Sequence, residues 1–251
     1  MIYGLYLSGQ GAQLQSLRQE VVANNLANAA TTSFKRDLVT AQSNLPFDSE
    51  RGKPTWVYGN LEAMPGGVTP AGVTTDFSQG DLKKTGAALD LAIQGPGFLR
   101  VADGNKSFLT RDGQVALGPQ NQLVTRDSGL TVLSSSGAAL TGFDPTLSIE
   151  VRPDGTVMQG DTEVGKLALV EPQTNTELTK FGRNLYSFSG KLNLAKSETE
   201  IKQGYLENSG VHPVSSMMEL IESSRVLEAN VNMIHYQDDS LSRLLGSLPR
   251  K

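Results

Sequence analysis

The chain has 251 residues and a formal net charge of −4, so it is long enough to bury a sizeable core and lacks the basic balance typical of nucleic-acid-binding domains. It has 26 glycines and 11 prolines but only 6% aromatic residues, which favours many turns and short strands over a helical globule. Because cysteine is absent, disulfides, thiolate zinc sites and a cysteine nucleophile are excluded. The sequence predicts neither a membrane-spanning apolar run nor a secretory signal peptide at the amino terminus.

The amino-terminal region up to Asn28 is predicted to form a helix with a thin apolar stripe. It lacks proline, and Leu7, Leu14 and Val21 recur at the sevenfold spacing of a coiled-coil seam. Asn24 continues the seam three residues after Val21 and shares a face with Asn28. These asparagines either fix the register of helix pairing at a cost in stability or cap the end of the helix. Alone in water this helix is expected to be marginal.

The carboxyl-terminal region gives the stronger helical signal. A helix is predicted to start near Pro213 and to continue to about residue 247, a length of roughly 50 Å. Its sevenfold series consists of Leu220, Leu227, Ile234, Leu241 and Leu248. A second row, three residues before members of that series, is predicted to complete the seam and contains Met217, Val231 and Leu245.

Between the helices the apolar period changes to two, which predicts short antiparallel strands. Turn residues separate three predicted hairpins, formed by residues 98–101 with 107–110, 115–117 with 122–125, and 148–151 with 156–158. A further strand pair is predicted around residues 166–170 and 184–188.

The predicted fold class is α+β, with an antiparallel β-rich central domain flanked by long terminal helices that pair as a coiled coil. The predicted parts are an amino-terminal helix with its following turn, an extended arm, a β-rich domain and a carboxyl-terminal helix, at residues 1–36, 37–74, 75–205 and 206–251. The helices either pair only within one monomer or also contact neighbouring copies through heterologous contacts that build a filament. The pattern alone leaves both arrangements open.

Five sequence blocks, in order along nearly the whole chain, resemble those of the flagellar rod and hook protein family. They lie at residues 22–36 (VANNLANAATTSFKR), 76–98 (with DFSQGDL and LDLAIQGPGF), 110–113 (TRDG), 203–211 (QGYLENSGV) and 225–230 (RVLEAN). In the first block Ser33 stands where the family usually has glycine. The proximal rod member of the family is a better match than the distal member in length, in its modest arm and in residues 149–184.

The resemblance implies a structural subunit of the flagellar basal-body rod, the hollow drive shaft that transmits torque from motor to hook. It implies export by the flagellar type III apparatus without a cleaved signal peptide, and assembly in the periplasm with copies of the chain and other rod proteins. No cofactor, metal, nucleic acid, small-molecule substrate or membrane insertion is expected. The expected assembly interface consists of Leu7, Leu14, Val21, Asn24, Asn28, Leu220, Leu227, Val231, Ile234 and Leu241.

Enzymatic alternatives have weak support in the sequence. His212 and His235 are far apart, and the Gly95–Gly97 pair lacks the third glycine of a dinucleotide-binding loop. Many aspartates accompany glycine in predicted turns, notably Asp103, Asp112 and Asp154, where turn chemistry explains them. The remaining alternatives are a hydrolase that uses carboxylates of the β domain, and a β-rich surface adhesin with coiled-coil stalks, for which a signal peptide would be the distinguishing feature.

Overall fold

A computed structural model describes residues 2–44, 66–104, 106–174, 178–194 and 199–246. The chain forms two compact units, each of which is continuous in space but not in sequence. Unit 1 comprises Met1–Ala27, Arg36–Asp76 and Val211–Lys251, and unit 2 comprises Asn28–Lys35 and Phe77–Gly210.

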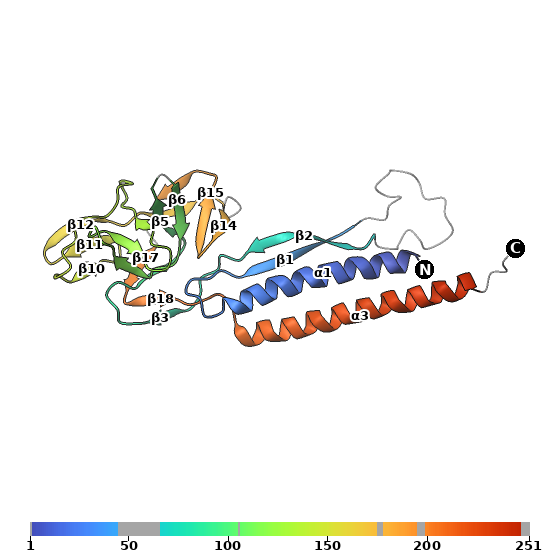
Figure 1. Cartoon of the computed structure of the whole chain (residues 1–251). Coiled ribbons are helices and arrows are strands. Elements are labelled where there is room, and N and C mark those ends of the chain that lie inside the picture. Colours follow the sequence, from blue (N-terminus) through green and yellow to red (C-terminus); the bar gives the residue numbers. More distant parts are fainter. Residues whose placement is uncertain (1, 45–65, 105, 175–177, 195–198, 247–251) are drawn as a thin grey trace. The chain divides into compact units, whose positions relative to one another are not determined.

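Unit 1 consists of two long helices and a two-stranded ribbon (Figure 1). Helix α1 spans Ile2–Ala27 and helix α3 spans Pro213–Gly246, and the two contact each other along their lengths. Strands β1 (Asp37–Ser43) and β2 (Val68–Thr75) pair antiparallel, and both contact α1. The start of α1 and the end of α3 lie at the same end of this unit, so the helices are antiparallel (Figure 1).

Both predicted helices are confirmed. Helix α3 starts at Pro213, as expected for a residue that has a helical φ and needs no hydrogen-bond acceptor for its nitrogen, and Ser216 N–H donates to the His212 carbonyl at 3.0 Å. No helix in the described ranges is long and apolar enough to cross a membrane. The ends of the predicted extended arm pair with each other as β1 and β2, and residues 45–65 of that arm lie outside the described residues.

Unit 2 is a β structure in which the described strands are short and pair antiparallel. The strands are β3 (Leu82–Lys84), β4 (Leu91–Gln94), β5 (Phe98–Asp103), β6 (Lys106–Thr110), β7 (Val115–Leu117), β8 (Leu123–Thr125), β9 (Thr131–Val132), β10 (Ile149–Val151), β11 (Thr156–Gln159), β12 (Thr162–Lys166), β13 (Leu169–Pro172), β14 (Leu178–Gly182), β15 (Leu185–Phe188), β16 (Leu192–Leu194), β17 (Glu200–Gln203) and β18 (Tyr205–Glu207).

The strands of unit 2 form one large sheet and several small ones. The large sheet has the order β14-β15-β6-β5-β9-β8-β7, and β13 joins it by pairing with β5 and with β16. A three-stranded sheet has the order β10-β11-β12, and two ribbons pair β17 with β4 and β18 with β3. The main core between these sheets includes Leu91, Ile93, Leu99, Val101 and Val157.

The α+β prediction and its three hairpins are confirmed as β5 with β6, β7 with β8, and β10 with β11. The fourth predicted pair was wrong. Its two segments form strands, but β13 pairs with β5 and β16, whereas β15 pairs with β14 and β6. Alternation of apolar residues identifies a strand, whereas the choice of its partner depends on long-range packing.

A buried ion network lies inside unit 2, centred on the carboxylate of Glu207 at the end of β18. One carboxylate oxygen is 2.6 Å from Lys35 Nζ and accepts the Gly80 N–H at 2.8 Å, and the other accepts Arg111 Nε–H at 2.9 Å. The side chains of Lys35, Glu207 and Arg111 are 1%, 1% and 4% exposed. Arg111 also donates to the carbonyl of Ile93 in β4 and to carbonyls of the loop after β4, and Lys35 donates to the Ser78 carbonyl. Each buried charge therefore has partners within the network.

Removing the Glu207 charge should destabilise unit 2 severely. Glu207→Gln leaves two buried cations without a counter-charge, and we expect the free energy of unfolding to fall by about 3–5 kcal/mol. Urea denaturation of the full chain measures this. Glu150→Gln, at an exposed position of β10, is the matched control and should stay within about 0.5 kcal/mol of the original chain. Equal stability of the two variants would contradict a central role for the network.

Candidate assembly interface

Helices α1 and α3 contact each other, and the described residues of the predicted sevenfold rows are half-buried on both helices. Leu7, Leu14 and Val21 are half-buried on α1, as are the series members Leu220, Leu227, Ile234 and Leu241 on α3. A second row of α3 consists of the half-buried Ser216, Asn230 and Gln237 and the fully buried Ser223. This row is polar, whereas the sequence pattern predicted an apolar row at Met217, Val231 and Leu245, which the structure places at exposed positions.

Two glycines of α1 lie directly against the polar row of α3. A Cβ atom added to Gly4 would lie 2.9 Å from Gln237 Nε2, and one added to Gly11 would lie 3.0 Å from Asn230 Oδ1. Gly9, in contrast, has no atom within 4 Å of such a Cβ position. The absence of a side chain at Gly4 and Gly11 thus makes room for the two amides.

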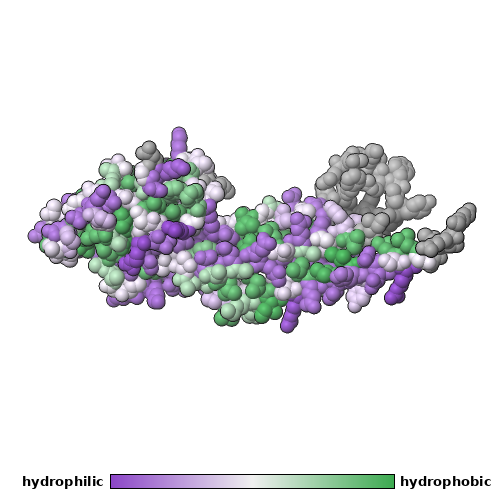
Figure 2. Space-filling view, in the orientation of Figure 1, coloured by the Kyte–Doolittle hydropathy of each residue, from purple (hydrophilic) through white to green (hydrophobic). Residues whose placement is uncertain are grey.

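The first two turns of α3 carry an exposed apolar stripe. Its members follow the i, i+3, i+4, i+7 spacing of one helix face and are Val214, Met217, Met218 and Ile221. Their side chains are 72%, 52%, 67% and 54% exposed, respectively. Figure 2 shows hydrophobic residues gathered on the surface over the start of α3. Contiguous exposed apolar surface of this kind is typical of protein contacts.

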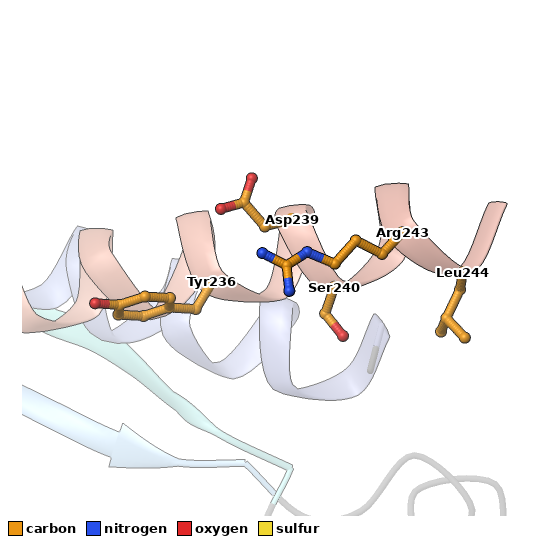
Figure 3. Close-up of a pocket in the computed structure, with 5 residues that line it drawn as sticks. All are labelled: Tyr236, Asp239, Ser240, Arg243 and Leu244. Atoms are coloured by element: carbon orange, nitrogen blue, oxygen red, sulfur yellow. The ribbon is translucent and has the colours of Figure 1, made fainter. Parts of the chain in front are cut away.

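A hollow of about 410 Å³ lies near the end of α3 and is lined, among the described residues, by Tyr236, Asp239, Ser240, Arg243 and Leu244 (Figure 3). The Arg243 guanidinium points back along the helix toward Asp239 in this view (Figure 3). The lining mixes one acid, one base and two hydroxyls without a nucleophile–base pair. No cluster of three or more potential metal ligands occurs among the residues that the structure describes.

Asn25 is the asparagine of the first block that the structure buries most deeply, and the sequence pattern did not single it out. Its side-chain oxygen accepts the Asp37 N–H at 2.9 Å, and its Nδ2 donates to the Asp37 carbonyl at 2.8 Å. The amide therefore binds the start of β1 to α1 as a paired strand would. Asn24 is exposed, and Asn28 accepts a hydrogen bond from Thr31 Oγ1 at 3.2 Å in the turn that belongs to unit 2. The Asn24–Asn25 pair marked this place in the sequence, but the sevenfold period selected Asn24, whereas Asn25 makes the contact with β1.

The turn at residues 28–35 is held by hydrogen bonds within unit 2. Ser33 has a φ of 57°, its N–H donates to the Glu207 carbonyl at 2.8 Å, and its hydroxyl donates to the Arg111 carbonyl at 2.9 Å. Asn184 Nδ2 donates to the Thr32 carbonyl at 2.7 Å, and Lys180 Nζ lies 4.4 Å from the centre of the Phe34 ring. The left-handed backbone at Ser33 accounts for a glycine preference at this position.

Comparison with known proteins agrees with this arrangement of helices and blocks. Three family models match in order along the chain: "Flagella basal body rod protein" at residues 5–35, "Flagellar hook protein FlgE/F/G D1 domain" at residues 92–159, and "Flagellar basal body rod FlgEFG protein C-terminal" at residues 202–246. The flagellar basal-body rod protein FlgF of Caulobacter vibrioides is 37% identical over 87% of this chain and 87% of its own length. FlgG of Buchnera aphidicola subsp. Schizaphis graminum is 30% identical over 97% of this chain and 99% of its own length. FlgF of Salmonella typhimurium is 30% identical over 97% of both chains.

The chain therefore belongs to the flagellar basal-body rod protein family, which confirms the resemblance predicted from the five blocks. It is a structural subunit of the rod, similar to FlgF and FlgG, and a component of the flagellar basal body.

The hydroxyl of Ser33 offsets the strain of its backbone. Ser33→Ala removes the hydrogen bond to the Arg111 carbonyl but keeps the positive φ, so we expect the free energy of unfolding to fall by about 1–2 kcal/mol. Ser33→Gly loses the same bond but removes a backbone strain of about 1–2 kcal/mol, and should stay within about 1 kcal/mol of the original chain. Urea denaturation separates the two variants. Equal losses in both would show that the backbone carries no strain.

The buried Asp112 makes stability depend on pH. Burial raises the pKa of Asp112, and the Gln114 N–H and the Thr32 hydroxyl oppose this effect. A raised pKa stabilises the fold only while the carboxyl is protonated, so this contribution is present below the unfolded-state pKa and is lost as pH rises through the folded-state pKa.

Asp112→Asn keeps an acceptor oxygen and removes the charge. We expect the variant to have a higher urea midpoint than the original chain near neutral pH, and the difference to shrink as the pH falls to about 4. Urea denaturation at the two pH values gives the comparison. A difference that is the same at both would exclude ionisation of Asp112 as its cause.

Proposed function

We propose that the chain builds the rod through unit 1, with α1 and α3 paired within one subunit as an antiparallel coiled coil and their outer faces in contact with neighbouring subunits. The observation that carries this proposal is the exposed apolar stripe at Val214, Met217, Met218 and Ile221, which the described part of the chain leaves in contact with water. Covering apolar surface is favourable by roughly 25 cal/mol per Å², so a neighbouring subunit that covers the stripe gains association energy.

The predicted interface residues take three roles in this proposal. The half-buried leucines, isoleucine and valine of the sevenfold rows form the internal seam of the helix pair. Val231, 39% exposed, and Asn24, also exposed, lie on outer faces that neighbouring subunits can contact. Asn28 shapes the turn after α1.

The wider role follows from the family. The assembled helices would form the wall of the hollow rod that transmits torque from the motor to the hook, with copies of the chain and other rod proteins as partners. Type III export and a periplasmic position belong to the same proposal. The 37% identity to a FlgF, compared with 30% to a FlgG that aligns over more of the chain, favours a FlgF-like subunit. FlgF is the proximal rod member of the family and FlgG the distal one, so we infer a position in the proximal rod.

We assign no catalytic role to the chain. Both oxygens of Glu207 are bonded to buried cations, and Asp112 accepts hydrogen bonds from the turn and from Gln114. These carboxylates therefore have structural partners, which leaves the hydrolase alternative without a candidate pair among them.

Acidic substitutions in the stripe test the assembly role. The double variant Met218→Glu with Ile221→Glu places charges on a surface that assembly should bury, which costs several kcal/mol unless they are paired. We expect its abundance in isolated hook–basal-body particles, measured by mass spectrometry in a strain without the original copy, to fall by at least about tenfold, the effect of only 1.4 kcal/mol.

Asn232→Glu is the control, because it adds a charge at an exposed polar position of α3 outside the stripe. Circular dichroism of each purified variant checks that it folds. Absence of the original chain from the particles would overturn the proposed function itself. Normal incorporation of the double variant would instead show that neighbours contact another surface.

A further inference from the structure

We propose that Gly4 and Gly11 act together with Gln237 and Asn230 to fix the register of α1 on α3. These are positioning residues, in which each amide side chain of α3 lies over a glycine of α1. The two glycines are seven residues apart, and so are the two amides, so the same contact repeats in successive heptads of an antiparallel pair.

The offset of these contacts also aligns the apolar rows. Continued along the helices, it places Leu7 at the level of Ile234, Leu14 at the level of Leu227, and Val21 at the level of Leu220. The seam therefore alternates apolar layers with layers in which an amide meets a glycine. All six of these apolar residues are half-buried, as this alignment requires.

A hydrogen bond within α3 orients the Asn230 side chain for its contact with α1. Its Nδ2 donates to the Val226 carbonyl of its own helix at 2.9 Å, which directs Oδ1 toward the backbone of Gly11. A methyl group at position 11 would lie 3.0 Å from Oδ1 and 3.3 Å from both other atoms of the amide, closer than ordinary van der Waals contact. A side chain at position 11 would therefore require the Asn230 amide to move.

Displacement of the helices by one heptad removes one of the two glycine–amide contacts. A shift in one direction places Gln237 opposite Gly11 but Asn230 opposite Arg18, which has a long side chain in place of a glycine. A shift in the other direction places Asn230 opposite Gly4 but Gly11 opposite Ser223, and leaves Gln237 beyond the start of α1. The apolar rows alone permit both shifts, because each would still pair residues of the sevenfold series. The two glycine–amide contacts form together only in the observed register, so they distinguish it from the shifted registers, which the apolar layers do not.

Buried amides are suited to this role because they are costly when misplaced. Gln237 Oε1 is buried without a hydrogen-bond partner within the described part of the chain. A polar group of this kind in a helical seam lowers stability but specifies one register. The consequence for assembly rests on the proposed function, since the register decides which outer surface the helix pair presents. The register itself can be measured independently of assembly.

The absence of cysteine permits a direct test by disulfide cross-linking of the full chain. We expect Leu14→Cys with Leu227→Cys to oxidise to an intramolecular disulfide with a yield at least about tenfold above that of Leu14→Cys with Ile234→Cys, a one-heptad shift. Dilute protein and electrophoresis separate intramolecular from intermolecular products. Equal yields from the two pairs, or no product from the first, would overturn the proposal.

The role of Gly11 is tested by measuring the yield of the 14–227 disulfide in three further variants. Gly11→Ala should reduce the yield of the 14–227 disulfide at least about threefold, and adding Asn230→Ala should restore it by removing the obstructing amide. Gly9→Ala is the matched control on the same helix, because its added methyl group meets no atom. It should leave the yield unchanged and raise the thermal midpoint by about 2–4 °C through the helix propensity of alanine.

Two results distinguish register control from a general loss of helix stability. If Gly11→Ala behaves like Gly9→Ala, or if Asn230→Ala fails to restore the cross-link, the glycine–amide contact does not set the register. Incorporation of the same variants into hook–basal-body particles is a separate readout. Normal cross-linking with no incorporation of the original chain would reject the rod assignment and leave the register intact.

Discussion

The carboxylate of Glu207 holds together parts of unit 2 that are far apart in the sequence. Lys35 belongs to the turn after α1, Gly80 precedes β3, and Arg111 follows β6, yet all three bind this one side chain. Burying three charges costs several kcal/mol per ion, and this cost is offset only where every charge has close partners. The network is therefore stable only when all of its segments are in place, which links the separate sequence blocks to one folded arrangement.

The same network fixes the positions where the chain leaves unit 2. Lys35 is the last residue of its short segment, and Gly210, three residues after Glu207, donates its N–H to the Phe34 carbonyl at 2.8 Å. The segments that lead to β1 and to α3 are thus bound to each other inside unit 2. This shared anchor reduces the conformational freedom that β1 and α3 lose when unit 1 folds, because both segments already start from one place.

The helical signal could be predicted from the sequence, but the composition of the seam could not. The series from Leu220 to Leu241 identified one row of α3 correctly, whereas a search for an apolar companion row selected Met217 and Val231 over the polar residues that lie toward α1. The polar row of α3 can be recognised as part of the helix contact only when the facing residues of α1 are known, because an amide can occupy a seam position if a glycine faces it. In α1 the glycines looked like defects, each costing about 1 kcal/mol relative to alanine.

The buried ion network was beyond sequence reasoning for a different physical reason. Lysine, arginine and glutamate are almost never fully buried unless paired, so the default interpretation of Lys35 and Glu207 is an exposed position. Their pairing joins residues separated by 172 positions, and no local period reports it. The family resemblance marked the blocks that contain these residues, but it gave no reason for their presence. Contact with a shared buried carboxylate supplies that reason for the blocks around residues 35, 80, 111 and 207.

The two units stabilise their folds by different means, and this difference suits a subunit of an assembly. Unit 2 has two buried apolar clusters and an ion network in which each buried charge has partners. The helices of unit 1 have seam residues that are mostly half-buried and large side chains such as Met218 and Tyr236 that are 67% and 71% exposed. A partner that binds the folded state but not the unfolded state stabilises the folded state. The helices should therefore gain stability as subunits are added, so that the rod becomes more rigid than the subunit from which it is built.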